Sequence, residues 1–182
     1  MNIKDRVSLY EKLIDINGDE YQLKIFITEM YELMTEVSKS FINDSKKDTI
    51  YQELADSIIC YEQFCIYALK LYVESIPQHS NIFKDELTFA PVYGDIFISV
   101  NETFTKIMKI LNDYLRDISI GEYDRVIDFR YINDIELLFT IFFENIKMLL
   151  VYVDNFNTGI LEICIDYKVS RLNNRVVNKK HL

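Results

Sequence analysis

Two pairs of acidic residues in the first third of the chain have a spacing that could do chemistry. Glu29 and Glu32 are three residues apart. Glu53 and Asp56 repeat this spacing further along the chain. At about 100° per residue, side chains three positions apart lie within about 60° of each other on one face of a helix. If the two helices pack as a hairpin, four carboxylates converge, and such crowding of like charge is unfavourable unless a cation neutralises it.

Magnesium is the cation that suits such a cluster, because it prefers hard oxygen ligands and commonly bridges carboxylates to substrate phosphates. Manganese is a chemically similar substitute. Glu36 follows Glu32 by one turn and is a candidate fifth member. Gln63 shares a helical face with Asp56, so its amide could contact a ligand, whereas Glu62 projects the other way and is expected to be solvated or paired. One such acidic pair is common on solvated helices, so only the two pairs together predict a site.

The elements that must position these residues are predicted to be helices. The chain of 182 residues contains only four Gly and two Pro, which are too few for the many turns of a β-rich fold. Apolar residues recur at steps of three and four, which predicts helices over about 3–14, 23–41, 48–74, 95–118, 129–155 and 158–177. The fold is therefore predicted to be an all-α bundle of about five to six helices.

Local signals indicate where the first three helices begin and end. Asn17-Gly18 is expected to end the first helix by supplying a left-handed cap. Asp48 or Thr49 can cap the third helix through a side-chain oxygen. The second and third helices are expected to be antiparallel neighbours. The apolar stripe of the second helix is predicted to comprise Leu23, Ile27, Met30, Met34, Val37 and Phe41.

The domain boundary is predicted from residues 77–94, where both prolines fall together with a glycine. We expect residues 1–76 and 158–177 to form a helical core. Residues 77–157 would be an inserted or degenerate second helical half, packed on the core in a single compact domain. A weak likeness of residues 25–28 to 96–99 fits either a decayed duplication or chance. In a duplication, the places of the four acids would be taken by Val100, Thr103, Asn133 and Glu136.

Composition limits the classes of partner. The net charge of −9 would repel nucleic acid or an anionic membrane over most of the surface. Cys60, Cys65 and Cys164 lack metal-ligand spacing and are expected to be buried free thiols in a reducing cytosol. The most apolar stretch, residues 135–153, is interrupted by charges, which favours a buried bundle helix over a membrane span. We therefore expect a cytoplasmic protein.

The acidic motifs also resemble a known family. Ile27-Thr-Glu-Met-Tyr-Glu-Leu33, followed by Gln52-Glu-Leu-Ala-Asp56, is similar to the EExxE and ExxD signature of MazG-like nucleotide pyrophosphohydrolases. Residues 9–22 resemble the lead-in helix of phage members of this family, and residues 165–172 resemble their closing helix. The resemblance covers roughly residues 8–74 and 160–176, and the residues between these two blocks match nothing in the family pattern.

The resemblance implies an all-α, magnesium-dependent enzyme that hydrolyses a nucleoside triphosphate to a monophosphate and pyrophosphate. Family members hold magnesium with the second and third glutamates of EExxE and both acids of ExxD. The chain departs from this pattern at Thr28, where the signature has its first glutamate, so the charge of that position is lost. By resemblance, the ligand role falls to Glu29, Glu32, Glu53 and Asp56.

Further roles are expected around the metal. Glu32 or Glu36 is expected to orient the attacking water. Contacts to phosphate oxygens are expected from Lys46, Lys47, Lys168 or Arg171, although each could be only a surface charge, and Gln63 is expected to bind substrate. A base could stack on an aromatic ring, although such rings more often pack in a core; the candidates are Tyr21, Tyr31, Tyr61 and Tyr67.

Two other interpretations remain open. A catalytically inactive MazG-like protein that binds nucleotide or a host protein is favoured by Thr28 and by the unmatched middle of the chain. A purely structural helical bundle is the third interpretation. In a phage or virus, the enzyme would control the nucleotide pool of the host cytoplasm. Family members associate through apolar faces, so we expect a homodimer, or an internal pseudo-dimer in which the extra helices replace a partner subunit.

Overall fold

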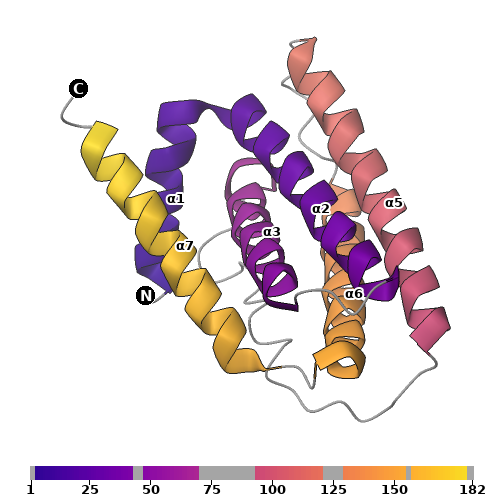
Figure 1. The fold of residues 1–182 in the computed structure, drawn as a ribbon. Helices are drawn as coiled ribbons and strands as arrows, with labels where there is room; N and C mark the ends of the chain where they lie inside the picture. Colours follow the sequence, from indigo (N-terminus) through magenta and orange to yellow (C-terminus); the bar gives the residue numbers. More distant parts are fainter. Residues whose placement is uncertain (1–2, 43–46, 70–92, 121–128, 155–156, 180–182) are drawn as a thin grey trace. The chain divides into compact units, whose positions relative to one another are not determined.

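The structure is a computed structural model of the chain. Six helices and no strand form in the residues it describes, which confirms the predicted all-α fold (Figure 1). None of these helices has the length together with the apolar character of a membrane span. The described residues are 3–42, 47–69, 93–120, 129–154 and 157–179.

The chain divides into two compact units, residues 1–76 with 159–182, and residues 77–158. The division into a helical core and an inserted or degenerate second half stays a prediction. Their association in a single compact domain stays a prediction, and each unit is described by itself below.

The first unit contains four helices, and the end of the first is set by a glycine. Gly18 has φ of 82°, a conformation that costs residues with a side chain about 1–2 kcal/mol. Its backbone N–H donates to the carbonyl of Ile14 at 2.7 Å, so the helix closes where the sequence predicted. The four helices are α1 (Ile3–Asn17), α2 (Asp19–Ile42), α3 (Lys47–Tyr67) and α7 (Thr158–Lys179).

Helices α2 and α3 pack along each other as an antiparallel hairpin, with α1 against both (Figure 1). Their direction follows from two contacts, because Thr49 pairs with Glu36 whereas the later Ser57 pairs with the earlier Glu29. The buried apolar stripe of α2 is wider than predicted. Its buried members on α2 are Leu23, Phe26, Met30, Leu33, Met34 and Val37.

Two members of the predicted stripe are not fully buried. Ile27 is half-buried, and Phe41, in the last turn of α2, is exposed. Phe26 fills the core instead, because its ring lies 5.6 Å from that of Phe64 and 6.4 Å from that of Tyr61 on α3. A core-facing helix buries a stripe of about 100° or more, wider than a single line of residues.

A buried ion pair attaches α1 to α3. Glu62 is fully buried and accepts hydrogen bonds from Arg6 Nη2 at 2.9 Å and from the hydroxyl of Tyr10 at 2.9 Å. Burial raises the pKa of Glu62, and Arg6 opposes that change. Of the two expectations for this residue, solvation was wrong and pairing is confirmed, because a buried carboxylate needs a counter-charge and hydrogen-bond donors.

Helix α3 ends at Tyr67 rather than near Glu74 as predicted. The backbone N–H groups of Ala68 and Leu69 both donate to the carbonyl of Phe64, at 3.0 and 3.3 Å. This shared acceptor breaks the regular ladder of the helix. Residues 70–74 lie outside the described residues.

The three cysteines are thiols, but only two are buried as predicted. Cys60 and Cys65 lie within α3, which is covered on several sides. Cys164 is half-buried, because it lies at the flank of α7, beside the buried Leu161 and Ile165 and near an exposed face. That prediction was wrong for Cys164.

The second unit is a hairpin of α5 (Tyr93–Ser119) and α6 (Phe129–Asp154). Its core contains Phe139, Phe142 and Phe143, all at most 1% exposed. The amide of Asn145 on α6 donates to the hydroxyl of Ser99 on α5 at 2.8 Å. Most apolar residues of the predicted stretch 135–153 are buried, as expected for a bundle helix.

Replacing Gly18 by Ala should lower the free energy of unfolding by about 1 kcal/mol, because a side chain strains the left-handed backbone. No atom lies within 4 Å of the added Cβ, so the cost comes from the backbone and not from crowding. Gly18→Asn is the matched control and should lose less, since Asn tolerates this conformation better. Urea denaturation measures both variants, and equal losses would contradict the explanation.

Candidate metal and ligand site

Three carboxylates converge where α2 packs against α3. Glu29 of α2 and Glu53 and Asp56 of α3 each offer one oxygen, and these oxygens lie within 4.8 Å of one another. All three side chains are partly buried. The hydroxyl of Ser57 donates to the backbone carbonyl of Glu29 at 3.3 Å, which fixes the register of the two helices at this level. The structure thus brings together three of the four predicted ligands.

The fourth predicted ligand, Glu32, is exposed and is not among the converging oxygens. It still lies close enough for its charge to raise the pKa of Glu29 and of Glu53. Because its side chain is exposed to solvent, Glu32 is better placed to contact water than to bind a metal directly.

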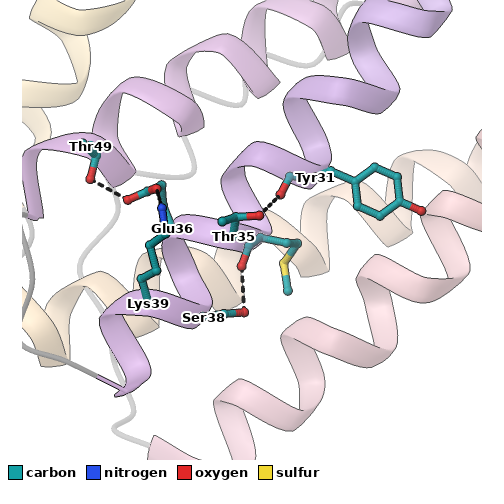
Figure 2. A network of polar contacts seen from close by, with 7 residues as sticks. Tyr31, Thr35, Glu36, Ser38, Lys39 and Thr49 are labelled. Carbon is teal, nitrogen blue, oxygen red and sulfur yellow. Dashed lines mark hydrogen bonds and ion pairs between the residues drawn. The ribbon is translucent and has the colours of Figure 1, made fainter.

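Both carboxylate oxygens of Glu36 accept hydrogen bonds from residues outside the acidic cluster. Its Oε1 accepts a hydrogen bond from Lys39 Nζ at 2.6 Å, and its Oε2 accepts one from the hydroxyl of Thr49 at 2.8 Å, as Figure 2 shows. The bonds from Lys39 and then Thr49 hold the pKa of Glu36 below its ordinary value. This glutamate therefore ties the end of α2 to the first turn of α3.

The pKa values of two of the converging carboxylates, those of Glu29 and Glu53, are raised. Burial and, after it, the charges of Asp56, Glu32 and Glu53 raise the pKa of Glu29 from 4.5 to about 7, while Lys168 opposes them. Burial and the charge of Asp56 also raise the pKa of Glu53. The three carboxylate oxygens carry negative charge that Lys168 neutralises only in part. Such a donor set could hold a hard divalent cation such as magnesium.

Lys168 brings an internal cation to this cluster from α7. Its Nζ donates a hydrogen bond to Oδ2 of Asp56, and the two side chains are only 18% and 21% exposed. Lys168 is one of the four basic residues predicted to contact phosphate oxygens. In the structure it neutralises part of the acidic cluster, so a phosphate contact would require the ammonium group to be shared or released.

A cavity of about 620 Å³ lies beside the acids within the first unit, a volume in the range of small-molecule sites. Five predicted site residues line it. These are Glu29, Asp56, Gln63, Lys168 and Arg171. Helices α1, α2, α3 and α7 all contribute to the wall, which also contains apolar and amide side chains.

Sequence reasoning missed several lining residues. Arg175 follows Lys168 by seven positions and Arg171 by four, a helical spacing that could have revealed a third cation on the same face. The amides Asn17, Gln22 and Asn178 carry no comparable signal, because amides are common on helices. All four residues line the cavity.

The remaining predicted residues divide between cavity, core, exposed surface and undescribed regions, and Tyr31 is exposed and does not line the cavity. Of the four tyrosines considered for stacking, Tyr21 lines the cavity and is 55% exposed. Tyr61 and Tyr67 are buried in the core. Lys46 lies outside the described residues, and Lys47 begins α3 with a side chain that is not described.

Comparisons with protein-family models, curated proteins and solved structures gave no match to the chain. The resemblance to MazG-like pyrophosphohydrolases therefore stays a prediction, as do the roles that it implies. The function proposed below rests on the acids, cations and cavity of the first unit.

Replacing Glu29 by Gln should stabilise the metal-free protein at pH 8. The folded pKa of about 7 lies above the ordinary value of 4.5, so the folded state binds the proton more tightly and stability falls as pH rises through this window. The gain should be about 1 kcal/mol after allowance for solvent screening of this partly exposed side chain. It should shrink towards pH 5.

Urea denaturation with a chelator present, at pH 5 and pH 8, measures this difference. Glu11→Gln, an exposed position on α1, is the matched control and should behave like the unmodified protein. A Glu29→Gln variant that is no more stable than the unmodified protein at pH 8 would show that the ionised Glu29 carboxylate does not destabilise the fold.

Proposed function

We propose that the protein is a magnesium-dependent nucleoside triphosphate pyrophosphohydrolase, which cleaves between the α- and β-phosphates to give a monophosphate and pyrophosphate. The observation that carries the proposal is the convergence of Glu29, Glu53 and Asp56 beside a cavity lined by Lys168 and Arg171. Carboxylates that could hold a metal and basic side chains that could bind phosphates thus occur together in the first unit. The proposed setting is the cytoplasm, where the enzyme would act on the nucleotide pool.

The donor set supports magnesium as the metal. Three carboxylate oxygens are hard ligands, and Glu29, Glu53 and Asp56 would hold the ion, with manganese as a substitute. When bound, the ion supplies neutralisation of charge on the phosphate oxygens and activation of water.

The chain's own residues supply position and charge, which dominate catalysis of phosphoryl transfer. The cations of α7 hold the phosphate chain; they are Lys168, Arg171 and Arg175. Glu32 orients the attacking water, because it is exposed beside the cluster. Glu36 is the weaker candidate for that role, since both of its oxygens already accept hydrogen bonds.

Nucleotide binding without hydrolysis is the second candidate, and two observations favour it. Thr28, where the family signature has a glutamate, is exposed and donates its hydroxyl to the carbonyl of Lys24 at 2.9 Å. Lys168 already pairs with Asp56. Calorimetry separates the candidates, because a pure binding protein would take up triphosphate and release no pyrophosphate with magnesium or manganese.

Replacing Glu53 by Gln should lower pyrophosphate release by more than about 100-fold, beyond the 10–100-fold typical of residues that only support metal ligands. Helix content by circular dichroism should not change, because Glu53 is only partly buried. A panel of ordinary and modified nucleoside triphosphates with magnesium, followed by chromatography of the products, measures release and base preference together.

Glu102→Gln, an exposed glutamate in the second unit, is the control and should keep full activity. Unchanged release by Glu53→Gln would defeat the assignment of the metal site. No release from any nucleotide by the unmodified protein would defeat the hydrolase and leave the binding candidate.

A further inference from the structure

Gln63 is a buried amide that faces the cavity. It is only 4% exposed and lines the cavity wall. Its side chain makes no hydrogen bond to any residue in the described ranges. An amide offers two donors and an acceptor, and those of Gln63 are not among the fully buried unpartnered atoms, so they are open to the cavity that this residue lines. The amide is therefore available to a partner that enters from the cavity.

A neighbouring glutamine shows the alternative. Gln22 of α2 also lines the cavity and is 5% exposed. Its Nε2 donates to the backbone carbonyl of Leu13 at 3.4 Å, so the fold itself supplies a partner. The two glutamines are similarly buried, but the fold supplies a hydrogen-bond partner to the amide of Gln22 and none among the described residues to that of Gln63.

The cavity has two chemically different ends. Gln22 precedes Glu29 by seven residues, and Gln63 follows Asp56 by seven. At 1.5 Å per residue, each pair is about 10 Å apart along its helix. Because α2 and α3 are antiparallel, both acids lie at one end and both glutamines at the other.

On α2 and α3 the wall between the two ends is apolar, whereas α7 lines the cavity with Arg171 and Arg175, and the glutamine end carries an aromatic ring. Ile25 and Ile59 line the cavity between the acids and the amides. Tyr21 stands next to Gln22 in the chain and also lines the cavity. A nucleotide has the matching order of groups, since its phosphates and its hydrogen-bonding base are separated by the sugar.

We infer that Gln63 is a specificity-determining residue that binds the nucleobase, with the phosphates at the acid end and the base at the glutamine end. Its amide donates one hydrogen bond and accepts another from a base edge that presents an acceptor beside a donor. This inference rests on the proposed function for the identity of the ligand. It adds the residue that recognises the nucleobase.

Calorimetric titration with magnesium and two kinds of probe tests the inference. The probes are inorganic tripolyphosphate and a set of α,β-methylene nucleoside triphosphates, which resist the proposed cleavage. The unmodified protein should bind the best analogue more tightly than tripolyphosphate. Gln63→Met, which keeps the volume and removes the amide, should weaken that analogue by roughly tenfold and leave tripolyphosphate unchanged.

Stability distinguishes recognition from a structural role. Because Gln63→Met removes an unpartnered buried amide, the ligand-free variant should melt at the same temperature as the unmodified protein or higher. Gln63→Leu is the second variant, in case Met packs poorly. Gln52→Met, at an exposed glutamine of the same helix, is the control and should change neither binding nor melting.

The outcomes separate this inference from the proposed function. Failure of every probe to bind the unmodified protein would overturn both. Equal binding of tripolyphosphate and all analogues, or an unchanged analogue affinity in Gln63→Met, would overturn the inference alone. A lower melting temperature in both Gln63 variants, with equal loss of both kinds of probe, would show that Gln63 is structural and would also overturn it.

Discussion

Repulsion among like charges is the constraint on which the first unit depends. Glu29, Glu53 and Asp56 present oxygens within 4.8 Å of one another at a packed helix interface. The apolar face shared by α2 and α3 must hold them there against that repulsion, and Lys168 relieves only part of it. The raised pKa of Glu29 follows from placing these acids where water cannot fully solvate them.

Helix α3 carries buried polar groups of two kinds, and the contrast separates structure from function. Glu62 is buried with Arg6 and Tyr10 as partners, so its charge is satisfied within the fold. Asp56 and Gln63 lie on the cavity side of the same helix, where the fold supplies one lysine for the acid and nothing described for the amide. A satisfied buried network needs no ligand, whereas an incomplete one indicates where a ligand would bind.

Local chemistry explains what the sequence could predict. The end of α1 at Gly18 and the buried stripe of α2 follow from backbone preference and helical period, which depend on near neighbours. The convergence of Glu29, Glu53 and Asp56 needed only one further assumption, a hairpin, although Glu32 lies outside the cluster. Long-range contacts were out of reach: the pairs Arg6–Glu62 and Asp56–Lys168 join residues 56 and 112 positions apart. Spacing within one helix carries no information on which distant helix will pack beside it.

The second unit shows that a helical hairpin of this kind does not require the acids. In the predicted internal alignment, Val100 and Thr103 of α5 stand where α2 has Glu29 and Glu32. Both are buried, and the hydroxyl of Thr103 donates to the carbonyl of Ser99 at 2.7 Å. Packing is thus achieved there with an apolar side chain and a locally satisfied hydroxyl. Because α2 and α3 could be joined in the same way, packing alone does not account for their carboxylates, which is consistent with the metal site proposed above.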